Sequence, residues 1–174
     1  RCAHVLRDYG VETQDRVLML ADDTVEFFYA YLGAMKIGAI PIAINLRVSA
    51  DDLGIMIEDS GCKVILAGAQ FLPLVNQAGQ NLKNMPPVIV IDQKESPNAN
   101  LPHLMAAKPD RIEPVMLAPE KSLLWLYTSG TTGRPKGVIH RIELINSIHI
   151  YLQEVYGLAP GDRIYCTSKL FFAF

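Results

Sequence analysis

Residues 15–45 read DRVLMLADDTVEFFYAYLGAMKIGAIPIAIN, and this stretch decides the fold class. It opens with the apolar run RVLMLA, which is typical of a strand buried on both faces of a sheet. A helical pattern follows and ends near Gly38. The apolar side chains at helical spacing are Phe27, Tyr31, Ala34 and Met35. The second apolar run, AIPIAIN, predicts another strand, so the stretch predicts a parallel βαβ unit.

Helix-start signals occur at two places that carry paired carboxylates. Asp22, Asp23 and Thr24 precede the first helical pattern, and Ser49–Asp52 has the form of a capping box before a helix that Gly61 ends. We expect the acidic pairs at both places to cap helices and not to serve as catalytic carboxylates.

The same alternation of strand and helix patterns continues along the chain. It predicts an α/β fold: a mostly parallel sheet with helices on both faces. Strands are predicted for CKVILAG, PPVIVID, SLLWLYT and RIYCTS, helices for FLPLVNQAGQNLKN and residues 145–156, and a strand or turn for GVIHRI.

Composition excludes several classes of protein. A net charge of −2 over 174 residues gives no basic footprint for nucleic acid or for an anionic membrane. No apolar run reaches the ~18 residues of a transmembrane helix. Cys2, Cys62 and Cys166 have no metal-ligand spacing, so we expect buried, reduced thiols in a cytoplasmic protein without a metal site. No feature specifies an oligomeric state.

The segment that carries chemistry follows the strand SLLWLYT and reads TSGTTGRPKG, residues 128–137. Glycines let successive backbone amides approach an anion, hydroxyls add donors, and Lys136 adds a positive charge. The pattern therefore predicts a phosphate-binding loop. Its candidate residues are Thr128, Ser129, Gly130, Thr131, Thr132, Gly133 and Lys136.

Two common nucleotide-binding motifs are excluded by spacing. Counting from Gly130, the second glycine of a Walker A loop would fall on Pro135, and Lys136 is followed by Gly137 instead of Ser or Thr. The dinucleotide fingerprint G-x-G-x-x-G occurs nowhere in the chain.

The run YTSGTTGRPKGV, residues 127–138, resembles the phosphate loop of the adenylate-forming superfamily, which comprises acyl- and aryl-CoA ligases, luciferases and peptide-synthetase adenylation domains. A finer resemblance lies at Ser168–Phe174, which is similar to the SAKLFFAY segment of benzoate–CoA ligases. In those ligases the Ala-Tyr pair lines the aryl pocket, which implies that role for Ala173 and Phe174. Phe174 lacks the tyrosine hydroxyl. His140 matches the first histidine of their His-Thr-His, which implies a place for His140 in the substrate pocket, whereas Ile142 replaces the second histidine.

The resemblance implies a fragment of an ATP-dependent ligase that activates a benzoate-like acid as acyl-AMP and transfers it to coenzyme A, with Mg²⁺ on the phosphates. We expect residues 1–174 to be an incomplete amino-terminal AMP-binding domain, truncated at both ends. The essential lysine of the family lies in a carboxy-terminal domain, so no residue here is assigned a catalytic role, and we expect the fragment alone to be inactive.

Three alternatives stay open at this point. A fatty acyl–CoA ligase or a peptide-synthetase adenylation domain would share the loop. A non-catalytic α/β module that binds a nucleotide or anion would also fit the isolated fragment.

Overall fold

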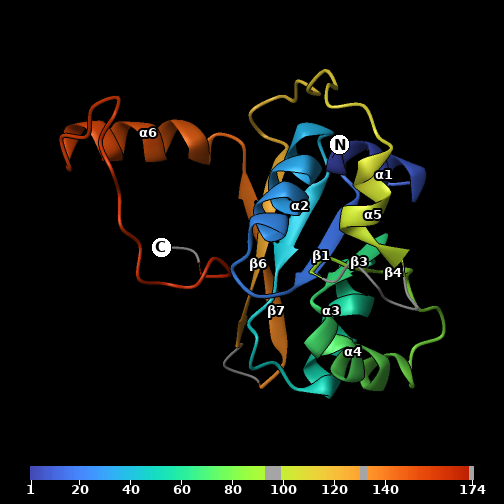
Figure 1. Cartoon of the computed structure of the whole chain (residues 1–174). Helices are drawn as coiled ribbons and strands as arrows, with labels where there is room; N and C mark the ends of the chain where they lie inside the picture. The colour runs from blue at the N-terminus through green and yellow to red at the C-terminus, as the bar shows by residue number, and fades with distance from the viewer. Residues whose placement is uncertain (93–98, 130–132, 173–174) are drawn as a thin grey trace.

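A computed structural model describes residues 1–92, 99–129 and 133–172. Its centre is a seven-stranded sheet with the order β5-β4-β3-β1-β2-β6-β7 (Figure 1). All neighbouring strands pair in parallel except β6 and β7, which form an antiparallel pair. The predicted α/β fold class is confirmed.

The elements follow the predicted alternation. The strands are β1 (Arg16–Leu20), β2 (Ile40–Ala43), β3 (Val64–Ala67), β4 (Val88–Val90), β5 (Ala99–Asn100), β6 (Ser122–Ser129) and β7 (Pro135–Arg141). The helices are α1 (Cys2–Asp8), α2 (Val25–Lys36), α3 (Ala50–Ser60), the short η1 (Ala69–Phe71), α4 (Leu72–Gly79), α5 (Leu101–Ala106) and α6 (Leu144–Glu154).

The core consists of two apolar layers, one on each face of the sheet. Alternate residues of β1 point to opposite layers, so Val17 and Met19 pack on one side and Leu18 and Leu20 on the other. Helices α1, α2 and α5 cover the first face, and α3 and α4 cover the second. Because both faces of β1 are buried, its sequence is continuously apolar.

The helix signals are confirmed at two of the predicted positions. The Thr24 hydroxyl accepts a hydrogen bond from the Phe27 amide at 3.3 Å, and the Ser49 hydroxyl accepts one from the Asp52 amide at 3.1 Å. Gly61 ends α3 with φ of 54°, a left-handed conformation that favours glycine.

The prediction that Asp22 and Asp23 cap α2 is wrong, because Thr24 fills that position. The Asp22 carboxylate accepts a hydrogen bond from the Gln70 side chain, and the Asp23 carboxylate accepts one from the Leu170 amide at 3.1 Å. Both carboxylates also lie within 4 Å of the Lys169 ammonium. These carboxylates therefore hold other parts of the chain.

One prediction near the end of the chain is wrong. RIYCTS forms no strand: no strand among the described residues pairs with it, and Tyr165 is 90% exposed. Residues 170–172 form a turn, with the Phe172 amide donating to the Lys169 carbonyl at 2.9 Å. Strand β6 forms as predicted and is partly buried, since it lies next to the edge strand of the sheet. No helix among the described residues is long and apolar enough to cross a bilayer.

The cysteines differ in exposure, which corrects the expectation that all are buried. Cys2 and Cys62 are buried, whereas Cys166 is exposed. Burial raises the pKa of Cys2 to about 12 and that of Cys62 to about 11. Both thiols therefore stay protonated near neutral pH, and the thiolate is the reactive form.

Alkylation of the folded chain with iodoacetamide at pH 8 should accordingly modify Cys166 alone. Mass spectrometry should find one label in buffer and three in denaturing urea. Cys166→Ser should remove the label obtained in buffer. Rapid labelling of Cys2 or Cys62 in the folded chain would contradict the burial described here.

Candidate functional site

The candidate phosphate loop joins the antiparallel strands β6 and β7. Thr128 pairs with Lys136 and Ser129 with Pro135, so the two strands bring these residues together at the base of the loop. Gly130, Thr131 and Thr132 lie outside the described residues. Because β6 runs parallel to β1, β2 and β3, the loop lies at the carboxyl edge of the sheet.

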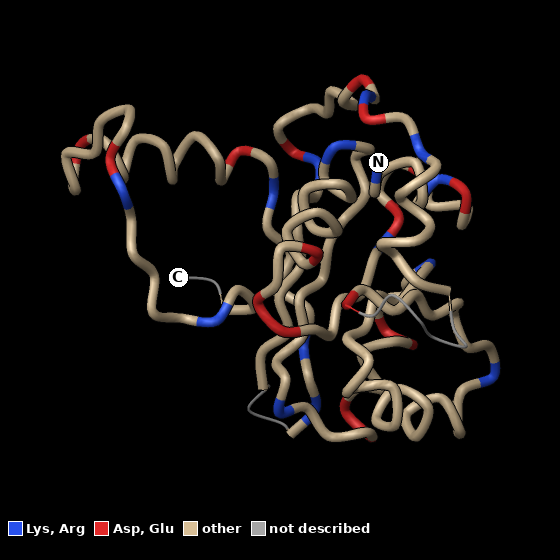
Figure 2. The backbone as a smooth tube through the Cα atoms, in the orientation of Figure 1, with Lys and Arg blue, Asp and Glu red and all other residues tan. Residues whose placement is uncertain are grey.

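The described residues of the loop offer donors and positive charge to solvent. Thr128, Ser129, Arg134 and Lys136 are all exposed. Figure 2 shows several basic positions at this end of the hairpin. Gly133 has φ of 80°, a conformation that favours glycine and turns the chain back toward β7. This arrangement can bind an anion with several oxygens, such as a polyphosphate.

Tyr127, the residue before the loop, makes its contacts on the face of the hairpin opposite to Thr128 and Lys136. Its hydroxyl donates to an Asp59 carboxylate oxygen of α3 at 2.6 Å and lies 3.4 Å from the Met56 carbonyl oxygen. Burial, followed by the hydrogen bond to Asp59 and the charge of Asp59, raises the pKa of Tyr127. The phenol therefore remains a donor at neutral pH. No sequence pattern points to Asp59 as a partner of Tyr127, because the two residues are 68 positions apart.

His140, predicted to line the substrate pocket, lies in β7 opposite Leu124. It shares a face of the strand with Lys136 but lies four positions farther along the strand, about 13 Å away. Beside His140 the first turn of α6 lines an open pocket through Leu144 and Ser147. The structure therefore places His140 on the same hairpin as the loop and does not bring it to Lys136.

Ala173 and Phe174 lie outside the described residues, but the segment before them is held at one place on the sheet. Lys169 and Leu170 contact the Asp22–Asp23 turn, which directly follows β1. Phe171 packs against the first core layer. Residues 169–172 therefore lie at the carboxyl edge of β1, the same edge of the sheet at which β6 leads into the loop.

The described residues contain no group of three His, Cys, Asp or Glu side chains that could hold a metal ion. A ring nitrogen of His4 lies 2.9 Å from the Arg111 carbonyl oxygen, which agrees with a structural histidine.

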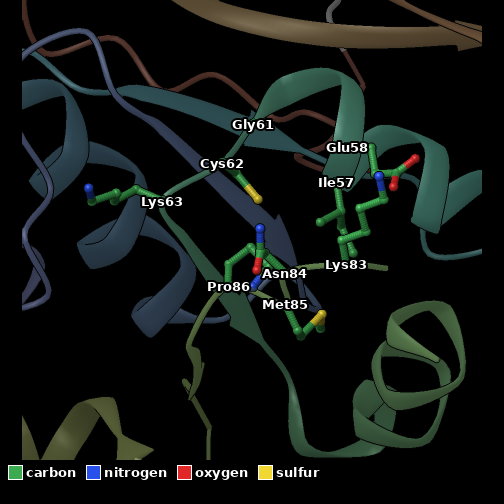
Figure 3. A pocket seen from close by; sticks show the side chains of 9 residues that line it. All are labelled: Ile57, Glu58, Gly61, Cys62, Lys63, Lys83, Asn84, Met85 and Pro86. Carbon is green, nitrogen blue, oxygen red and sulfur yellow. The ribbon is translucent and has the colours of Figure 1, made fainter. Parts of the chain in front are cut away.

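A separate pocket of about 500 Å³ lies between the end of α3, the start of β3 and the segment before β4. Figure 3 shows Cys62 pointing toward Asn84, while Lys63 points away from the other lining side chains. Gly61, Cys62 and Lys63 precede β3, so this pocket lies at the amino edge of the sheet. It is not part of the candidate site, because the loop lies at the carboxyl edge.

Known proteins match this chain over its whole length. The family model described as "AMP-binding enzyme" matches residues 1–174. A 3-hydroxybenzoate–CoA/4-hydroxybenzoate–CoA ligase of Thauera aromatica is 39% identical over 99% of the chain and 33% of the ligase. A long-chain-fatty-acid–CoA ligase of Mycobacterium tuberculosis is 37% identical over 98% of the chain and 33% of that enzyme.

A solved structure with the same fold is that of an anthranilate–CoA ligase in complex with anthranoyl-AMP. It superposes with a TM-score of 0.92 at 26% identity and covers 98% of this chain and 33% of the ligase chain. The chain thus spans about a third of the length of the ligases it matches.

Proposed function

The chain belongs to the AMP-binding enzyme family, and on that premise we propose that the protein carrying it is an AMP-forming acid–CoA ligase for benzoate-like aryl acids. Residues 1–174 are part of the large amino-terminal domain of that ligase. The observation that carries the proposal lies at the carboxyl edge of the sheet, where the exposed residues Thr128 and Lys136 pair at the base of the loop.

The proposed reaction has two steps. A carboxylate oxygen of the acid attacks the α-phosphorus of ATP, and the bond to the bridging oxygen of pyrophosphate breaks. The thiol of coenzyme A then attacks the acyl carbon, AMP leaves with the carboxylate oxygen, and the thiol proton passes to solvent. Such chemistry depends mainly on positioning and on neutralising charge.

In this reaction the chain holds the phosphates that leave. The hydroxyls of Thr128 and Ser129 and the ammonium of Lys136 donate to the β- and γ-phosphate oxygens, with Thr131, Thr132 and the glycine amides completing the site. Mg²⁺ bound to the phosphates would neutralise further charge. The proposal assigns no side chain of residues 1–174 to the metal.

The acid site is proposed at Ala173 and Phe174, with His140 of β7, four positions along the strand from Lys136, as a third lining residue. Support comes from the preceding residues, since Asp23 holds Leu170 at the carboxyl edge of the sheet, where the loop also lies. A small residue next to a flat ring suits a planar acid. The protein is proposed to act in the cytoplasm, where ATP and coenzyme A are both available.

The alternative within the family is a fatty acyl–CoA ligase, because one such enzyme is 37% identical to this chain. A peptide-synthetase adenylation domain shares the loop but would not release its product as a CoA thioester. A non-catalytic module would bind ATP without turnover.

A panel of acids separates these functions. ATP–pyrophosphate exchange by the full-length protein should be faster with benzoate, hydroxybenzoates and anthranilate than with palmitate, and coenzyme A should then yield the thioester. Faster exchange with palmitate would identify the fatty acyl ligase. Calorimetric binding of ATP with no exchange for any acid would favour the non-catalytic module.

A further inference from the structure

The hydrogen bond between Tyr127 and Asp59 lies at the point where the phosphate loop leaves the sheet. Tyr127 is the last residue before Thr128, and it pairs across the hairpin with Gly137, the residue after Lys136. Residues 128–136 therefore all lie between the two members of this pair. A displacement of Tyr127 would shift Thr128 and Lys136 together.

The two faces of the hairpin formed by β6 and β7 carry different side chains next to the loop. Side chains alternate along a strand, so Thr128 and Lys136 share one face while Tyr127 points to the other, where α3 lies. The Tyr127 ring lies against Gly137, since a Cβ placed at Gly137 would be in ordinary van der Waals contact, 3.5 Å, with the ring carbon that bears the hydroxyl. The Tyr127 side chain thus joins α3 to the strand residue that immediately precedes the loop.

We propose that Tyr127, through its hydrogen bond to Asp59, is a positioning residue for the phosphate loop. It fixes where Thr128 and Lys136 lie relative to the sheet, and so where their side chains can donate to the phosphates of ATP. A hydrogen bond of 2.6 Å to a carboxylate is of the strong, charge-assisted kind. Helix α3 is itself fixed by the second core layer, so Asp59 supplies a rigid support. This role rests on the proposed function and adds to it a contact outside the loop.

Strand β6 is also anchored at its other end, which provides a matched control. The Gln14 side chain donates to the Ser122 carbonyl at 3.0 Å and accepts from the Ser122 amide at 3.2 Å. Gln14→Ala removes two hydrogen bonds from the same strand, but at the end away from the loop.

In the full-length protein, Tyr127→Phe should raise the KM for ATP and slow adenylate formation by about tenfold, the effect of losing one charge-assisted hydrogen bond. The KM for benzoate and the rate of thioester formation from supplied benzoyl-AMP should not change. Asp59→Leu should reproduce the loss, and Asp59→Asn should restore most of the activity because its amide oxygen accepts the same hydrogen bond. The double variant Tyr127→Phe/Asp59→Leu should be no slower than either single variant, because both remove one interaction.

Gln14→Ala should leave the KM for ATP unchanged even if it lowers the melting temperature. An equal rise in that KM for Gln14→Ala and Tyr127→Phe would overturn the proposal, since the effect would then follow the stability of β6. Unchanged ATP kinetics in Tyr127→Phe, in an active enzyme, would overturn this role and leave the proposed function intact. A wild type that adenylates no acid would overturn the proposed function and this role with it.

Discussion

Replacing Lys136 by alanine in the full-length protein should slow adenylate formation by about ten- to a hundredfold. Lys136 pairs with Thr128 at the base of the loop, so its ammonium is expected to donate to the departing pyrophosphate. Losing one charge-assisted hydrogen bond costs roughly 1.5–3 kcal/mol when it acts in the transition state. Thioester formation from a supplied acyl-adenylate should be little affected, because pyrophosphate has left before that step. Thr131→Ala should likewise slow adenylate formation more than thioester formation.

Two variants control for charge and for stability. Lys136→Arg keeps the positive charge and should lose less activity than Lys136→Ala. Lys121 is exposed just before β6, at the other end of the hairpin, so Lys121→Ala should leave both steps unchanged. Equal losses in adenylate and thioester formation for Lys136→Ala would contradict a role on pyrophosphate.

Replacing Ala173 by leucine should change the choice of acid. Replacing a methyl side chain by an isobutyl one in a filled pocket costs roughly 1–3 kcal/mol, which corresponds to a loss of about 5- to 150-fold. Ring-substituted acids should lose more activity than benzoate itself, because they fill more of the pocket. The measurement is pyrophosphate release for a panel of acids, with the melting temperature of each variant.

Ala159→Leu serves as the control, since Ala159 is exposed beyond α6. It should leave the order of acids unchanged. If Ala173→Leu lowered the rate with every acid by the same factor, together with the melting temperature, the side chain would only pack the protein. The assignment of Ala173 and Phe174 to the acid site would then be wrong.

The parts of the fold that the sequence predicts correctly depend on local patterns. Strand β1 can be predicted because both of its faces are buried, which makes its sequence continuously apolar. Helix α3 can be predicted because Ser49 and Gly61 cap its two ends. The loop at residues 128–137 is legible because its residue types and their order are specific.

The errors occur where contacts between distant residues decide the outcome. Asp22 and Asp23 resemble helix caps in the sequence, but their carboxylates bind Gln70, Lys169 and Leu170, and the contact with Leu170 spans 147 positions. RIYCTS has the composition of a strand, but a strand forms only beside a partner. Asp59 was missed for the same reason, since its hydrogen bond to Tyr127 joins residues 68 positions apart.

Isotope transfer tests the central claim, the formation of an acyl-adenylate, most directly. Benzoate labelled with ¹⁸O in both carboxylate positions is incubated with the full-length protein, ATP and coenzyme A, and the products are analysed by mass spectrometry. Attack by the carboxylate on the α-phosphorus predicts AMP that carries a single ¹⁸O atom and unlabelled pyrophosphate. Unlabelled AMP, or label in inorganic phosphate with ADP as the nucleotide product, would contradict it.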